Sequence, residues 1–204
     1  MSAPYHVSER ASLEPLDGTF EAGSTFSEMV AASTRNTELF RIGRAHAVVP
    51  AEYAARIAAT GRAWHLLTIS EDWCGDAVNT VHWVDALADS SPLLTHRIIP
   101  RDRHLALMDR HLTNGRSRSI PIVLLLDDGF VERAWWGPRP RALQAWFESA
   151  EAQALGKDER YKILRTRYAR DRGRAILEEI TAMIEGVAQS EAAFAESATA
   201  HAAS

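Results

Sequence analysis

Short apolar runs alternate with helical segments between residues 63 and 150, and this alternation restricts the fold more than any other feature of the sequence. The runs are rich in branched apolar residues and too short for buried helices, which predicts strands. The order strand, helix, strand, helix, strand, strand, helix predicts an α/β fold with a mixed sheet flanked by helices. The expected strands are 64–69, 93–99, 122–126 and 131–136, and the expected helices are 77–87, 103–111 (capped by Asp102) and 139–150.

Turn and capping residues indicate how the strands are connected and where further helices begin. Asp127-Asp128-Gly129 is a hairpin-turn signal, so the last two strands should be antiparallel, whereas the first crossover should be right-handed and parallel. Before the first strand, Thr25 and Glu28 have the spacing of a capping box, and Asn36 and Pro50 suit the starts of two more helices. Beyond Gly156 the pattern predicts a long helix.

The chain is expected to fold as a single main unit with additions at both ends. Residues 1–23 are polar and aperiodic, which predicts a flexible lead-in with order beginning near Thr25. Residues 24–152 should form the α/β domain with its N-terminal helices. Residues 153–204 should form a C-terminal helical extension, and its Ala/Ser/Glu-rich tail from Ala188 is expected to fray or remain disordered.

The overall composition limits which partners and which cellular location are expected for this chain. The 204 residues carry 23 Lys and Arg against 27 Asp and Glu, and a net charge of -4 gives no general attraction to nucleic acid or anionic membranes. An excess of basic residues in 157–174 is interpreted as a solvated helix face. Neither a membrane-spanning apolar stretch nor the pattern of a secretory signal is found, which favours a cytoplasmic protein.

The single cysteine, Cys74, follows the first strand and precedes a helix. A helix N-terminus presents unpaired N–H groups and favours an anion, here a thiolate. Because Ala77 stands three residues on, no second sulfur is available for a local disulfide. The thiol is therefore either a nucleophile that forms bonds with another molecule or a small buried apolar residue.

Three markers along residues 64–150 resemble the thioredoxin fold. Trp73-Cys74-Gly75 resembles the start of its Trp-Cys-Gly-Pro-Cys motif, Ile120-Pro121 resembles its Ile-Pro pair with a cis proline, and Gly137 resembles a glycine after its last strand. The resemblance implies a thioredoxin-like fold in which an extended thiol-containing partner pairs with the backbone beside Pro121. It places Cys74 in the catalytic role and Trp73, Gly75, Ile120, Pro121 and Gly137 around the substrate. Asp76, two residues beyond the thiol, is the second candidate catalytic residue.

The motif departs from that family at two points. Asp76 and Ala77 replace the proline and the second cysteine, and Thr68 stands where the family has a buried acid. Ordinary dithiol reduction is therefore not expected. Asp76 can act as a helix-capping carboxylate, raise the thiol pKa by its charge, or relay a proton. Trp73 can line the rim of the site or lie in the core.

No cofactor or metal is expected beyond a small thiol such as glutathione as co-substrate. Four arginines near the predicted site would bind its carboxylates, or else be solvated at the surface: Arg116, Arg118, Arg139 and Arg141. The eight histidines show no ligand spacing with the cysteine. An iron–sulfur cluster shared by two chains, as in monothiol glutaredoxins, is an alternative that the motif does not match.

Two functions follow from the sequence. The first is a monothiol redox protein in which Cys74 forms a mixed disulfide with a small thiol or a protein partner. The second is a redox-inactive module that binds a peptide or protein in the groove beside Trp73 and Pro121.

Overall fold

A central five-stranded sheet organises the chain. The structure is a computed structural model that describes residues 3–8 and 14–202. The strands are β1 His6–Val7, β2 Trp64–Ser70, β3 Leu94–Pro100, β4 Ile122–Leu126 and β5 Glu132–Trp136, and their order in the sheet is β1-β5-β4-β2-β3. β2 pairs with β3 in parallel and with β4 antiparallel, and β4 pairs antiparallel with β5. The predicted mixed sheet is confirmed.

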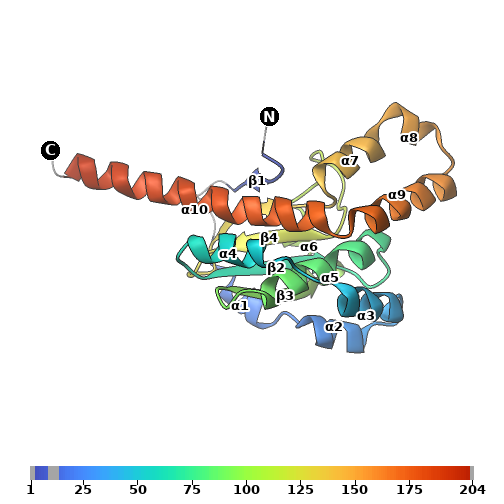
Figure 1. The fold of residues 1–204 in the computed structure, drawn as a ribbon, viewed down its shortest axis with the longest axis horizontal. Helices are drawn as coiled ribbons and strands as arrows, with labels where there is room; N and C mark the ends of the chain where they lie inside the picture. Colours follow the sequence, from blue (N-terminus) through green and yellow to red (C-terminus); the bar gives the residue numbers. More distant parts are fainter. Residues whose placement is uncertain (1–2, 9–13, 203–204) are drawn as a thin grey trace.

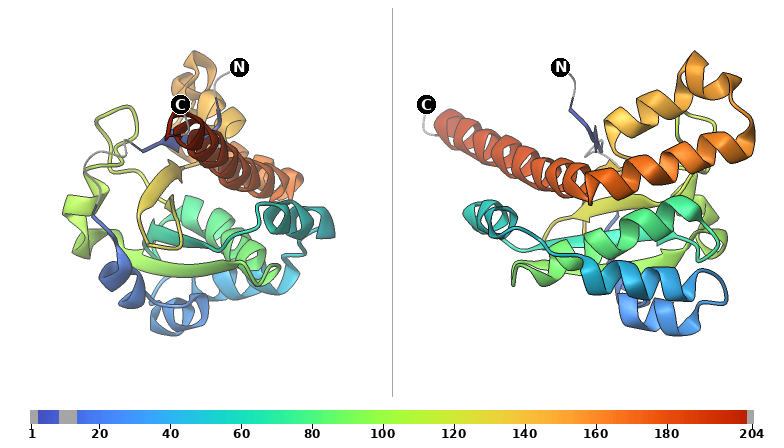
Figure 2. Two further views of the ribbon diagram at one scale, coloured as in Figure 1. Left: turned by 90° about the vertical axis from the view of Figure 1, so that its left-hand side faces the viewer. Right: turned by 45° about the vertical axis from the view of Figure 1, so that its right-hand side comes forward.

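Helices cover both faces of this sheet. They are α1 Asp17–Glu21, α2 Phe26–Ala32, α3 Thr37–His46, α4 Ala51–Ala59, α5 Gly75–Asp89, α6 Leu105–Met108, α7 Arg141–Glu148, α8 Ala150–Ala154, α9 Lys157–Asp171 and α10 Arg174–Ala202. The N-terminal helices α1 to α3 lie on one side of the sheet, and α9 and α10 lie on the other (Figures 1 and 2).

Side chains alternate between the two faces of each strand and so contribute to two separate hydrophobic cores. On β4, Val123 and Leu125 pack with α4, α7 and α10, whereas Ile122 and Leu124 pack with α1, α2 and α6. Because both faces are covered, every residue of β4 is buried and the strand has no polar side. α5 contributes to both cores, and it begins directly beyond the carboxyl end of β2.

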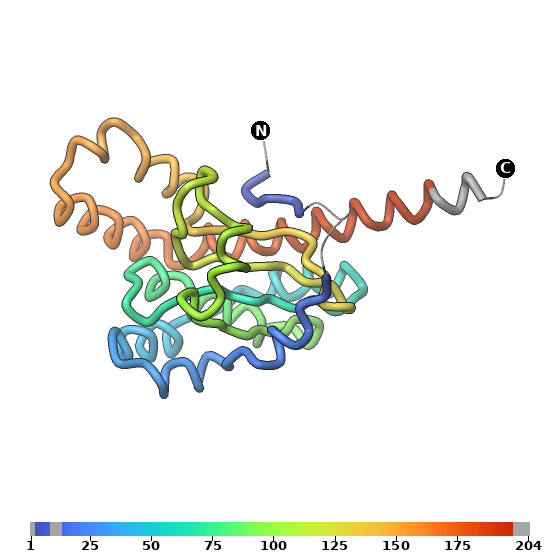
Figure 3. The backbone as a smooth tube through the Cα atoms, turned by 180° about the vertical axis from the view of Figure 1, so that it is seen from behind, coloured from blue at the N-terminus to red at the C-terminus, as the bar shows by residue number. Residues whose placement is uncertain are grey.

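The N-terminal segment contains more structure than the sequence predicts. Within the expected lead-in, β1 lies beside β5 (Figure 3) and pairs with it antiparallel as the edge strand of the sheet. α1, also within this segment, buries Phe20. Ordered structure therefore begins before Thr25. The prediction failed because β1 is held by its pairing with residues 134–135, which local periodicity cannot show. Residues 9–13 of that lead-in lie outside the described part.

Three predicted helices are divided in the structure. The predicted helix 103–111 is a 3₁₀ turn, Arg101–Arg103, followed by α6, and its cap residue is His104 rather than Asp102. The predicted helix 139–150 is also shorter, because Ser149 leaves the helical region and its hydroxyl caps α8. The long helix beyond Gly156 breaks into α9 and α10 at Arg172 and Gly173, which both have positive φ.

The C-terminal helices belong to the main core. Ile176, Ile180 and Ile184 of α10 are fully buried in the cluster that also contains Leu66 of β2 and Trp136 of β5. α10 then continues to Ala202, beyond the point where the Ala/Ser/Glu-rich tail was expected to fray. Ala and Glu are strong helix formers, so composition that lacks apolar anchors is still compatible with a helix. Residues 203 and 204 lie outside the described part.

Candidate functional site

The turn that carries Cys74 is held in place by the α2–α3 connection. The carboxylate of Asp72 accepts hydrogen bonds from the backbone N–H groups of Thr34, at 2.7 Å, and Arg35, at 3.0 Å. The side-chain amide of Asn36 donates to the Asp72 carbonyl at 2.8 Å. Asn36 is the N-cap residue of α3, as the sequence predicted, although its side chain makes no cap hydrogen bond. The turn is thereby fixed between β2 and α5.

Cys74 is the N-cap residue of α5, at the helix start that the sequence predicted. Its side chain is almost covered, since the residue is 8% exposed, and Sγ donates to the carbonyl oxygen of Ile120 at 3.3 Å. The Ile120–Pro121 peptide bond is cis. The fold thus brings the only cysteine of the chain against the loop that leads into β4.

The thiol is held in its neutral form. Burial raises the pKa of Cys74, and the negative charge of Asp76 raises it further. The N–H groups of Ala77 and Asp76 at the helix start, and the charge of Arg139, act in the opposite direction without reversing the shift. The helix N-terminus alone favours a thiolate, but loss of water around the sulfur outweighs it here.

Asp76 is buried and paired with a residue from the opposite side of the site. Arg139 donates to both carboxylate oxygens, from Nε at 2.9 Å and from Nη2 at 2.6 Å. The hydroxyl of Tyr168 on α9 donates to Oδ1 at 3.1 Å. Burial and the Asp76 charge raise the pKa of Tyr168 well above its usual range, so the phenol stays protonated and remains a donor. Neither Arg139 nor Tyr168 was predicted to bind Asp76.

The sequence suggested that Arg139 either binds the carboxylates of a small thiol or is solvated at the surface. In the structure its guanidinium is instead buried and paired with Asp76. It is 8% exposed, and its guanidinium lies over the ring of Phe147, 4.0 Å from the ring centroid. Local pattern could not indicate this burial, because Arg139 follows a Gly-Pro turn of the kind typical of exposed loops. The pair needs the segment after β5 to lie near the start of α5, which only the assembled fold provides.

Gly137 lies against the Pro121 loop. Its φ is +130°, and a Cβ added at this position would lie 2.4 Å from the carbonyl oxygen of Pro121. Only glycine allows the end of β5 to approach that loop so closely. Gly137 and Pro121, predicted from distant parts of the sequence, are thus brought together, and the adjoining Ile120 contacts Cys74.

Trp73 lies at the rim rather than in the core, because it is 41% exposed. The guanidinium of Arg101 lies over its ring, 4.9 Å from the centroid, and also donates to the Arg118 carbonyl at 3.2 Å. Arg101 was not singled out in the sequence. Gly75 is exposed, and a Cβ there would meet open space.

The remaining predicted arginines are distributed differently. Arg118 is exposed and forms a bidentate ion pair with Asp109 at 2.6 and 2.8 Å. Arg116 is exposed in the loop before β4, and the backbone N–H of Arg141 donates to Glu179. These positions do not form one cluster around the sulfur.

Thr68 occupies the position of the family's buried acid and joins a buried polar chain. Its hydroxyl shares a 2.9 Å hydrogen bond with Nε2 of His96, whose Nδ1 lies 3.3 Å from Asp85. Asp85 is in turn paired with Arg44 at 2.7 Å. The sheet interior at this point therefore holds a threonine and an imidazole where a dithiol enzyme has a carboxyl group.

Within residues 3–8 and 14–202, no three or more His, Cys, Asp and Glu side chains are grouped so as to hold a metal ion. None of the helices in the described part combines the length and the apolar character needed to cross a bilayer.

The chain resembles the crystal structure of a protein of unknown function from Pseudomonas aeruginosa, with a TM-score of 0.68 and 21% identity over 85% of this chain and 98% of that one. It also resembles an HIV epitope scaffold, with a TM-score of 0.66 and 21% identity over 85% of this chain and 99% of the scaffold. No curated protein matches the sequence. A family model described as thioredoxin matches residues 23–154, more than half of the chain, and the chain therefore belongs to the thioredoxin family.

Proposed function

We propose that Cys74 forms a mixed disulfide with a small thiol such as glutathione or with a protein cysteine. The observation that carries this proposal is the position of Sγ, 3.3 Å from the Ile120 carbonyl and at the N-cap of α5. In this position the sulfur faces the loop whose backbone would pair with an extended partner. Trp73 and Gly75, both exposed, would border the partner, and Gly137 would leave room for the Pro121 loop.

The chemistry is thiol–disulfide exchange. The Cys74 thiol loses its proton to solvent, and its sulfur attacks one sulfur of an oxidised partner such as glutathione disulfide. A new S–S bond forms to Cys74 as the partner's own S–S bond breaks, and the departing sulfur takes up a proton. No net electron transfer to a cofactor is needed, because the partner disulfide is the oxidant.

The raised thiol pKa determines the kinetics of this exchange. At neutral pH few molecules carry the thiolate, so attack is slow. A thiol of high pKa is also a poor leaving group, and no second cysteine is present in the chain to displace the partner. We therefore infer a slowly formed, long-lived adduct rather than the rapid turnover of a dithiol reductase.

Asp76 has a positioning role in this proposal. Its carboxylate oxygens already accept hydrogen bonds from Arg139 and Tyr168, which leaves it poorly placed to relay a proton. It acts on the sulfur through its charge and through the N-terminal turn of α5, which the ion pair fixes against the end of β5.

The test is an incubation of the folded protein with glutathione disulfide, followed by intact-mass measurement. One glutathione per chain is expected, forming more slowly than on the urea-unfolded chain. The Cys74→Ser variant is the matched control and should form no adduct. If the folded protein stays unmodified while the unfolded chain is modified, the proposal is wrong.

A second candidate function is supported by the burial of the Cys74 side chain. The neutral, 8% exposed thiol suits a redox-inactive module that binds a peptide beside Trp73. Peptides selected from a displayed library under reducing conditions would distinguish the two functions. The module predicts binding that survives Cys74→Ser and is weakened by Trp73→Ala, whereas the redox function predicts no such cysteine-independent binder.

A further inference from the structure

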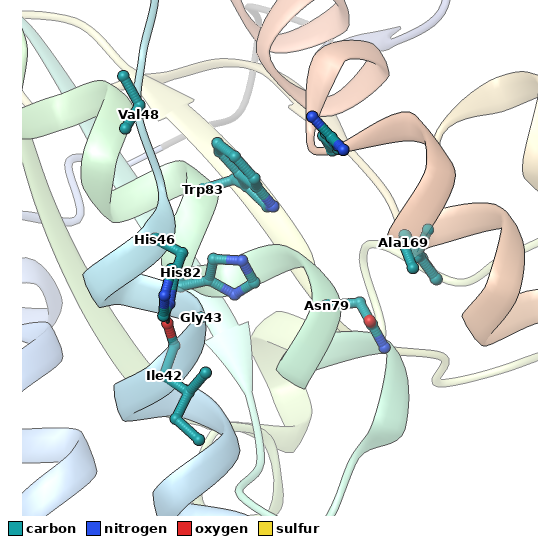
Figure 4. A pocket seen from close by; sticks show the side chains of 10 residues that line it. Ile42, Gly43, His46, Val48, Asn79, His82, Trp83 and Ala169 are labelled. Atoms are coloured by element: carbon teal, nitrogen blue, oxygen red, sulfur yellow. Dashed lines mark hydrogen bonds between the residues drawn. The ribbon is translucent and has the colours of Figure 1, made fainter.

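A second concave site lies along α5 and does not include Cys74. A pocket of about 650 Å³ opens between α3, α5 and the end of α9, and it lies within the size range of small-molecule sites. Figure 4 shows the rings of His82 and Trp83 between α3 and α9. Cys74 does not line this pocket, so its occupant would be distinct from a partner of the thiol.

One part of the pocket wall is apolar and suited to a flat ring. Trp83 presents an indole that is fixed from behind, because a Cβ on Gly173 would lie 2.2 Å from its Cδ2 atom. Ile42 and Val48 complete this part and are 48% and 78% exposed. Aromatic side chains favour stacked or edge contacts with another ring. These exposed apolar side chains would be covered by a ligand.

The polar part of the wall favours an anion. None of the described residues that line the pocket is acidic, and the exposed Arg172 is among them. His82 contributes a neutral ring, since burial lowers its pKa to about 4. Its Nδ1 lies 2.9 Å from the Val78 carbonyl and so carries the hydrogen, which leaves Nε2 as an acceptor. A guanidinium pairs with a carboxylate through two parallel hydrogen bonds.

The wall of the pocket is also bonded to the residues that follow Cys74. Asn79 donates to the Gly75 carbonyl at 2.7 Å, and the Tyr168 hydroxyl donates to Asp76 at 3.1 Å. Both Asn79 and Tyr168 line the pocket. These bonds fix one wall, so this part of the pocket is already formed without a ligand, which lowers the entropic cost of binding.

We propose that this pocket binds a small aromatic carboxylate, with the ring against Trp83 and the carboxylate on the guanidinium of Arg172. The site is independent of the thiol chemistry proposed for Cys74, because the recognition uses none of the residues around the sulfur. Binding and disulfide formation can therefore succeed or fail separately.

The probe for this site is 2-naphthoate, titrated into the full-length protein by calorimetry, with the neutral 2-naphthalenemethanol as its uncharged counterpart. We expect saturable binding at one site, and weaker binding of the alcohol. Arg172→Gln should weaken naphthoate binding by about tenfold, the usual effect of losing one charge-assisted contact. Arg170→Gln, on the same exposed helix but outside the pocket, is the matched control and should leave the affinity unchanged.

A filling variant tests the location. Ala169 lines the pocket from the exposed surface of α9, so Ala169→Phe should fill the cavity without disturbing the core, and circular dichroism would verify the fold. Naphthoate binding should then be lost. The proposal is overturned if the wild-type protein shows no saturable binding, if Ala169→Phe binds as tightly as the wild type, or if the alcohol binds as well as the acid.

Discussion

Arg139 holds both carboxylate oxygens of Asp76, at 2.9 and 2.6 Å, although the two residues are 63 positions apart in the sequence. Asp76 lies two residues after Cys74, at the start of α5, and Arg139 lies just beyond β5. The pair therefore joins the motif that carries the sulfur to the segment that follows Gly137. Because both side chains are under 10% exposed, water screens the interaction weakly.

Removal of the arginine should destabilise the fold strongly. Arg139→Met leaves the Asp76 charge buried without its ion-pair partner, which typically costs about 3–5 kcal/mol in the free energy of unfolding. Urea denaturation measures this. Arg116→Gln, an exposed loop arginine, is the control and should change stability by less than about 0.5 kcal/mol. The double variant Asp76→Leu/Arg139→Met should be more stable than Arg139→Met; equal or lower stability would contradict a buried-charge penalty.

The charges of Asp76 and Arg139 should shift the pKa of the Cys74 thiol in opposite directions. The rate of Cys74 alkylation against pH should show a midpoint above the ordinary thiol value of about 8.5. Asp76→Asn removes a negative charge near the sulfur and should lower the midpoint, whereas Arg139→Gln removes a positive charge and should raise it. Intact-mass kinetics on variants verified as folded would measure both shifts. Two shifts of the same sign would show that the charges act only through the fold.

Gly137 should tolerate no side chain. In Gly137→Ala the new Cβ would meet the Pro121 carbonyl at 2.4 Å, with φ at +130°, so we expect a loss of about 2–4 kcal/mol. Gly18→Ala is the control, because its Cβ meets nothing within 4 Å and alanine favours the helix. That variant should be neutral or slightly stabilised. A Gly137→Ala protein with wild-type thermal stability would disprove the close approach of the two loops.

Stability should fall as the solution is acidified from pH 6.5 to pH 4, in part through His82. Its pKa is about 4 in the folded protein and 6.5 when unperturbed, so between these values the unfolded chain binds the extra proton and unfolding is favoured. The full difference corresponds to about 3 kcal/mol. Urea unfolding at several pH values should show a flatter dependence for His82→Gln than for the wild type.

Local patterns determined much of the architecture and the position of the site. The apolar runs and the Asp127-Asp128-Gly129 turn predicted the four main strands and the antiparallel hairpin, because strand periodicity and turn chemistry depend on neighbouring residues. Cys74 at the start of α5 followed from the junction of a strand and a helix, again a local feature.

Only the tertiary structure decided which side chains pair with Asp76 and in which direction the pKa of the Cys74 thiol is shifted. Tyr168 lies 92 residues beyond Asp76 and Arg139 lies 63 beyond it, and no local pattern can show that these three side chains share one buried network. The breaks in the C-terminal helices and the pairing of β1 likewise depend on contacts with distant residues. The sequence determined that a lone cysteine begins a helix, where the dipole favours a thiolate. Folding then buried its sulfur beside Asp76, and loss of hydration, which depends on everything packed around the sulfur, raised the thiol pKa instead.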